Sequence, residues 1–84
     1  MKLTDIVKVG TEHYCVDSCW TSDLGYETMV FTCDIEGGII DWHDLYAKHY
    51  SNEVEMSIGH IEVVNMLKQI NELMNYINLI EYEN

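Results

Sequence analysis

The 84-residue sequence contains no proline and no arginine, and its three cysteines are an odd number. Without proline, nothing in the chain interrupts a long helix. Disulfide frameworks normally use cysteines in pairs, so Cys15, Cys19 and Cys33 fit better as reduced packing residues of a cytoplasmic protein. No apolar run approaches the ~20 residues of a membrane span, and the N-terminal residues lack the apolar core of a secretory signal. We therefore expect no membrane partner.

The length allows a single domain spanning residues 1–84. A domain of this size buries only about 60% of its unfolded surface, so its stability is marginal without a partner, a metal or a disulfide. Hydrophobic residues make up 48% of the chain, which excludes a disordered acidic tail.

Charge is the strongest compositional signal. Fifteen acids against four lysines give a formal net charge of −11. Between Lys8 and Lys48 the sequence holds eight acids and no base. Direct nucleic-acid binding is excluded in practice, because it depends on basic contacts to phosphate. A basic protein surface would be attracted. The alternative is that the acidity serves only solubility.

Alternating apolar and polar residues predict a sheet in the first part of the chain, over about residues 3–50. Residues 13–20 and 26–33 alternate between two faces and are separated by the turn signal Ser22 to Gly25, which predicts an antiparallel hairpin. Residues 3–9 predict a further short strand. Residues 39–50 are ambiguous from pattern alone, since 45–50 fits either a strand or a turn of helix.

The last part of the chain predicts one long helix over about residues 52–82. Asn52 with Glu55 three residues later is typical of a helix N-cap. The fold class is therefore α+β: a small antiparallel sheet of three or four strands packed against one long C-terminal helix. Apolar spacing of 4-3-4-3 along this helix predicts a homodimer through residues that extend beyond the sheet: Val63, Leu67, Ile70, Met74 and Ile77.

One combination of motifs resembles a known family. A strand of sequence Tyr-Glu-Thr-Met-Val-Phe (26–31) precedes Trp42, Leu45-Tyr46 and Tyr50-Ser51, and Gly59-His60 follows within the helix. Over residues 14–67 this order resembles a family of small tailed-bacteriophage proteins, with a strand close to FETMVF, a W…Y-S/T stretch and a helix carrying Gly-His. The resemblance implies a strand at 45–50 and the cytoplasm of an infected bacterium as the location. It implies no particular activity.

The sequence offers little sign of catalysis, cofactor binding or a metal centre. On one strand, the Cα atoms of Cys15 and Cys19 would lie about 13 Å apart, too far for two ligands of one zinc. No Gly-rich turn accompanies a cysteine–histidine pair. We expect no catalytic residue, no cofactor and no metal. Within the helix, Gly59 is explained by close packing on the sheet, while His60 is either a structural hydrogen-bonding residue or a functional one.

These observations favour a non-enzymatic, phage-encoded binding protein. Its expected partner is a host protein with a basic, nucleic-acid-binding surface, which it would inhibit as an acidic mimic in host takeover, anti-defence or anti-CRISPR activity. Aromatic residues anchor interfaces and carboxylates set their register, so the predicted contact residues are Asp17, Trp20, Asp23, Glu27, Asp34, Glu36, Asp41, Trp42 and Asp44. The alternative is a phage accessory or assembly protein that oligomerises through its helix. A small enzyme or metalloprotein is a third, weaker alternative.

Overall fold

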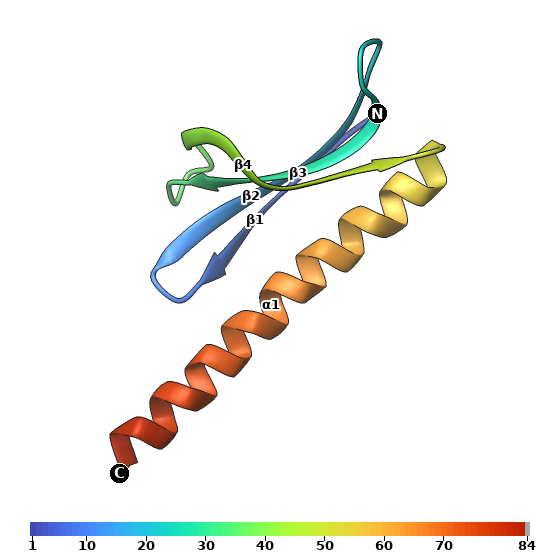
Figure 1. Cartoon of the computed structure of the whole chain (residues 1–84). Helices are drawn as coiled ribbons and strands as arrows, with labels where there is room; N and C mark the ends of the chain where they lie inside the picture. The colour runs from blue at the N-terminus through green and yellow to red at the C-terminus, as the bar shows by residue number, and fades with distance from the viewer. Residues whose placement is uncertain (84) are drawn as a thin grey trace.

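The computed structural model describes residues 1–83, which form four strands followed by one helix. The elements are β1 (Lys2–Val9), β2 (Glu12–Thr21), β3 (Gly25–Cys33), β4 (Ile39–Tyr50) and α1 (Glu53–Glu83). Each strand pairs antiparallel with the next one in sequence, so the sheet order is β1-β2-β3-β4. Helix α1 lies on one face of this sheet (Figure 1). The predicted α+β architecture is confirmed.

The predicted central hairpin is also confirmed. Strands β2 and β3 pair from His13 opposite Cys33 to Trp20 opposite Tyr26. The turn between them ends at Gly25, whose φ of 71° is a conformation that glycine adopts without steric cost. The whole of residues 39–50 forms β4, which resolves the ambiguity at 45–50 in favour of a strand.

The core lies between the sheet and the first half of α1. Alternate residues of the strands point toward the helix, as the pleat of a β-sheet requires. The buried cluster combines valines of three strands with two valines of the helix: Val7, Val9, Val16, Val30, Val63 and Val64. Met56, in the first turn of α1, is fully buried. Each such side chain contributes about 1.5–3 kcal/mol through removal from water.

Helix α1 begins at the predicted cap. The Glu55 backbone N–H donates to Asn52 Oδ1 at 2.9 Å, and Glu55 Oε2 accepts from the Ser51 backbone N–H at 3.2 Å. Two backbone donors that have no partner inside a helix are thereby satisfied. Glu53 and Glu55 also place negative charge at the positive end of the helix dipole.

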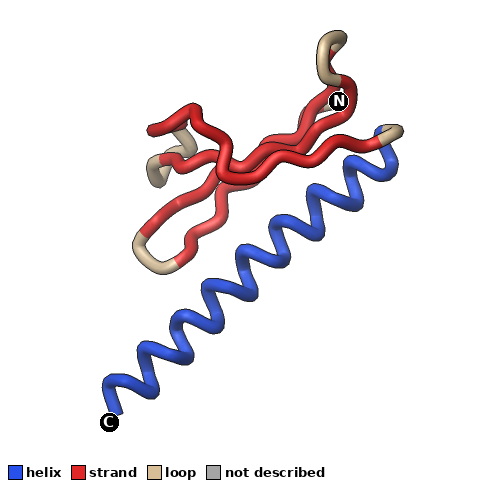
Figure 2. The backbone as a smooth tube through the Cα atoms, viewed as in Figure 1, coloured by secondary structure: helices blue, strands red, loops and turns tan. Residues whose placement is uncertain are grey.

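The second half of α1 extends past the sheet. At 31 residues the helix is about 46 Å long, longer than any strand in the sheet (Figure 2). Its last hydrogen bond to the sheet side is made by Asn71, whose Oδ1 accepts from the Gly10 backbone N–H at 2.9 Å, and the Met74 side chain also lies beside Gly10. Residues 72–81 are exposed. Within residues 1–83 no helix combines the length and apolar character needed to cross a membrane.

Candidate functional site

The stretch from Asp34 to Asp44, which we call the acidic segment, connects β3 to the irregular start of β4. It begins with a tight turn built on Asp34. The Oδ1 atom of Asp34 accepts backbone hydrogen bonds from Glu36 at 2.9 Å and Gly38 at 2.8 Å. Gly37 has a φ of 91° and lies directly against the Ile6 side chain, so a residue with a Cβ there would be strained and would clash. Asp34 therefore has a structural role besides its charge.

The start of β4 is bulged, and this exposes a tryptophan. Val30 pairs with Tyr46 and Thr32 pairs with Asp41, so residues 42–45 lie between these pairs, opposite Phe31 alone. The ring of Trp42 packs edge-on against Phe31, with centroids 5.4 Å apart and planes at 64°. Even so, Trp42 remains 73% exposed. Bulges are frequent beside functional sites, where they redirect a side chain.

Apolar and acidic side chains are mixed in the acidic segment. Ile35 is 75% exposed and Ile40 is 66% exposed. Together with Trp42 they stand among the carboxylates of Asp34, Glu36, Asp41 and Asp44, with no lysine or arginine in the segment. The Asp41 carboxylate accepts a hydrogen bond from the His43 backbone N–H at 2.9 Å, which holds the chain next to Trp42 in place. Apolar anchors with a charged rim are the usual composition of a protein interface.

The nine predicted contact residues lie in three places. The acidic segment holds five of them: Asp34, Glu36, Asp41, Trp42 and Asp44. Trp20 and Asp23 lie at the β2–β3 turn, and the length of β3, about 30 Å, separates them from that segment. Asp17 and Glu27 lie in mid-strand on the face away from α1.

Glu27 was predicted to contact a partner, but it is buried in this structure, with only 8% of its surface exposed. Its carboxylate lies 3.2 Å from Nε2 of His49 on β4. A buried carboxylate of this kind is satisfied inside the chain. Trp20 is 54% exposed, and Asp23 is exposed at the turn. The structure thus brings five of the nine residues together and leaves the others apart.

His60 lies at the centre of a polar network that joins α1 to the sheet. It is 3% exposed. Its Nε2 is 2.7 Å from Asp5 Oδ2, and its Nδ1 is 2.6 Å from Ser18 Oγ. Ser18 Oγ is in turn 2.6 Å from Thr28 Oγ1. An ionised carboxylate only accepts, so Nε2 carries a proton and donates to Asp5, while Nδ1 shares a hydrogen bond with the Ser18 hydroxyl.

Asp5, His60 and Ser18 are the residue types of a hydrolytic triad, but Ser18 is too deeply buried to meet a substrate. Ser18 and Thr28 are both 0% exposed, so no substrate reaches the serine hydroxyl in this structure. A nucleophile needs access and oxyanion-stabilising donors. The network instead satisfies polar groups in the core and fixes the position of α1 on β1 and β2. The sequence allowed His60 a structural hydrogen bond but did not identify Asp5 and Ser18 as its partners.

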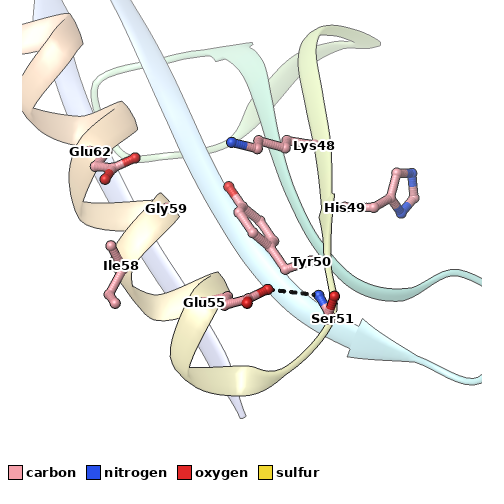
Figure 3. A pocket seen from close by; sticks show the side chains of 8 residues that line it. All are labelled: Lys48, His49, Tyr50, Ser51, Glu55, Ile58, Gly59 and Glu62. Atoms are coloured by element: carbon pink, nitrogen blue, oxygen red, sulfur yellow. Dashed lines mark hydrogen bonds between the residues drawn. The ribbon is translucent and has the colours of Figure 1, made fainter.

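A pocket of about 490 Å³ lies where α1 leaves the end of β4 (Figure 3). Lys48, Tyr50 and Glu62 point toward one another across it. The Tyr50 ring lies directly against Gly59, so close that any Cβ at that position would overlap it. This explains the glycine by close packing, as predicted. The Lys48 ammonium lies 5.6 Å from the centre of the Tyr50 ring. The Tyr50 hydroxyl is buried and finds no hydrogen-bond partner within residues 1–83.

The three cysteines are free thiols. Burial raises the pKa of Cys15, and the nearby Asp17 carboxylate adds to this. Burial also raises the pKa of Cys33, with a smaller contribution from Asp34. A raised pKa makes a thiol a poor nucleophile at neutral pH. Among the residues that the structure describes, no three His, Cys, Asp or Glu side chains come together as a metal site would require.

The predicted oligomerisation residues divide between the core and the surface. Val63 is 5% exposed and belongs to the core of a single chain, so it is not free to contact another. Leu67 packs partly against that core. Ile70, Met74 and Ile77 are 41%, 40% and 45% exposed. In the first half of α1 the predicted seam is therefore covered by the chain's own sheet, and its exposed residues lie in the second half of the helix.

Comparison of the chain with protein-family models, with curated proteins and with solved structures gave no match in any of the three. The phage resemblance therefore stays a prediction, and the fold and its surfaces carry the functional argument.

Proposed function

We propose that this chain is a non-enzymatic, phage-encoded binding protein that occupies a basic surface on a host protein and inhibits it as an acidic mimic. The observation that carries the proposal is the acidic segment, where Trp42 and Ile40 stand exposed among four carboxylates and no base. Packing of Trp42 on Phe31 limits its motion, which lowers the entropy lost when a partner covers it. A nucleic-acid-binding surface is basic and commonly carries groups that stack, which suits this mixture.

The test is the capture of partners from host lysate on the immobilised chain, followed by binding kinetics with the captured protein. Carboxylates at the rim of an interface mainly raise the association rate. We therefore expect Glu36→Gln, Asp41→Asn and Asp44→Asn together to slow association about tenfold or more at low salt. Asp34 is left unchanged because it holds the turn. Trp42→Ala should instead speed dissociation, as expected for a central anchor.

The matched control removes three carboxylates from the helix by Glu62→Gln, Glu72→Gln and Glu81→Gln. The change in net charge is the same, so an equal loss of association rate would mean that only total charge matters. A captured partner that is itself acidic, or binding that is indifferent to salt between about 50 and 500 mM, would end the mimic proposal.

A second function is favoured by a different observation. Six of the ten residues at 71–80 are large and apolar, and each of them is 40% exposed or more: Leu73, Met74, Tyr76, Ile77, Leu79 and Ile80. Exposed apolar surface of this extent is typical of an association site. We propose, as the alternative, an accessory or assembly module that forms homodimers through α1. Its first test is the molar mass in solution at tens of micromolar.

A further inference from the structure

The exposed apolar residues of α1 form a stripe that differs from the predicted seam. We define the outer stripe as the residues at 4-3-4-3 spacing that flank the sheet-facing side of the helix: Met66, Ile70, Leu73, Ile77 and Ile80. Each is between 40% and 60% exposed. With 3.6 residues per turn, this spacing keeps all five on one side of the helix. The stripe is therefore the shape of surface that packs against a second helix.

The outer stripe runs into a groove beside the sheet. The groove, of about 320 Å³, lies between the helix residues Met66 and Ile70 and the sheet residues Tyr14, Leu45 and Tyr46. Its lining is almost wholly apolar. Leu45 is 58% exposed there. The same two helix residues line the groove and begin the stripe, so the groove and the projecting helix form one continuous apolar surface.

Charge indicates which partner fits this surface. Residues 63–80 contain one lysine, Lys68, and one acid, Glu72, so their formal charge is zero, and the rest of the chain carries the whole −11. A basic partner gains nothing electrostatically at such a neutral segment. Two copies of this acidic protein repel one another at most other contacts. The helix segment is the place where a second copy can approach.

We infer that the outer stripe and the adjoining groove form a twofold, antiparallel dimer interface that receives α1 of a second copy. The inference rests on the alternative function proposed above and specifies its surface. With Leu73 facing Leu73 of the second copy, Ile77 of that copy lies beside Ile70, and its Ile80 lies beside Met66 at the groove. Each projecting helix end thereby fills the groove of the other chain, as an isologous interface requires.

Electrostatics favours antiparallel over parallel pairing. Leu73 lies ten residues, or roughly 15 Å along the helix, beyond Val63, which packs on the sheet. An antiparallel pair centred on Leu73 thus places Val63 of one chain roughly 30 Å from Val63 of the other, several times the ~8 Å Debye length at physiological salt, whereas the β1–β2 turns, which reach Asn71, lie near the twofold axis. A parallel pair would hold the two acidic sheets side by side at a helix spacing of about 8–10 Å. The two sheets overlap along their whole length only in the second arrangement, so repulsion between them is weaker in the first.

The first experiment is sedimentation equilibrium of the full chain at tens of micromolar. We expect a dimer mass for the wild type and a monomer mass for the double variant Leu73→Asp, Ile77→Asp, with unchanged circular dichroism. Leu79 is 56% exposed in the same part of the helix but lies off the outer stripe. Leu79→Asp is therefore the matched control and should remain a dimer. A monomeric wild type would refute both the inference and the oligomerising function.

The second experiment tests direction by disulfide trapping in a Cys19→Ser background. Antiparallel pairing predicts that Met66→Cys chains mixed with Ile80→Cys chains form the mixed disulfide, while neither chain alone cross-links to itself. Self-cross-linking of each chain would mean a parallel dimer. It would overturn the present inference and leave the proposed oligomerisation standing. Dissociation by Leu79→Asp but not by the Leu73→Asp, Ile77→Asp pair would likewise move the interface off the outer stripe.

Discussion

Gly59 gives the sharpest test of the packing between α1 and β4. The effect of Gly59→Ala on the free energy of unfolding should change sign with the residue at position 50. The Tyr50 ring occupies the space that a Cβ at position 59 would need. Gly59→Ala therefore has two opposed effects. It removes the conformational cost of glycine within a helix, and it forces the ring of Tyr50 or the helix itself to move.

The two effects can be weighed against each other. Alanine is favoured over glycine in a helix interior by about 1 kcal/mol. Inserting a methyl group into filled space costs about 1–3 kcal/mol. We expect Gly59→Ala to lower the free energy of unfolding by about 1 kcal/mol, which is a fall in melting temperature of about 4–8 °C for a domain of this size. In a Tyr50→Ala background the space is open, so the same change should raise the free energy of unfolding by about 1 kcal/mol.

The assay is urea unfolding of the four proteins of the double-mutant cycle, at a protein concentration held constant. The expected coupling is about 2 kcal/mol, well above the ~0.5 kcal/mol within which independent sites add. Asn65→Ala, at an exposed site of the same helix, is the control and should have equal effects in both backgrounds. Stabilisation by Gly59→Ala in the wild type, or coupling below ~0.5 kcal/mol, would refute the packing argument.

Two further predictions concern the buried polar groups. Because the folded pKa of Cys15 and Cys33 is raised, stability is fully present below the unfolded thiol pKa of about 8.5 and falls as pH rises above it. Urea midpoints between pH 7 and 10 measure this, and iodoacetamide should modify the less buried Cys19 first. His60→Leu should cost about 1–3 kcal/mol through buried polar groups left unpaired. Asp5→Asn should cost much less, since the amide oxygen of asparagine still accepts a hydrogen bond and the Asp5 side chain is 56% exposed to water; equal losses would contradict this account of the network.

Local pattern predicted most of this fold because the relevant signals are short-range. Alternation of faces and a turn ending in Gly25 determine the hairpin, and Asn52 marks the start of the helix. The bulge near Trp42 could not be predicted, since it depends on how β4 crosses the sheet and not on its own sequence. The Ser18–His60 contact could not be predicted either, because it joins residues 42 apart. The sequence does hold a signal for this contact, however. Ser18 and Thr28 are polar, although strand alternation places them on the same faces as the buried Val16 and Val30.

The helix was harder to interpret because two apolar periodicities overlap in it. The predicted seam follows the residues that pack on the sheet, and it merges with the outer stripe only where the sheet ends. A 4-3-4-3 spacing identifies an apolar side of a helix that must be buried, but it does not show whether the protein's own sheet or another chain buries it. Burial of Val63 answers that for the first half of α1.

Segregation of charge from apolar surface gives the two proposed surfaces different partners. The acidic segment lies at the end of the sheet, where Trp42 shares one stretch of chain with four carboxylates, and the field of such a segment favours a basic protein. The outer stripe lies on a segment of zero formal charge, where attraction depends on shape and apolar area alone. Because salt screens the first kind of contact and leaves the second nearly unchanged, raising the ionic strength should weaken a basic partner's binding while the dimer persists. The two functions proposed for this protein can therefore be separated in solution, and neither requires the other to be wrong.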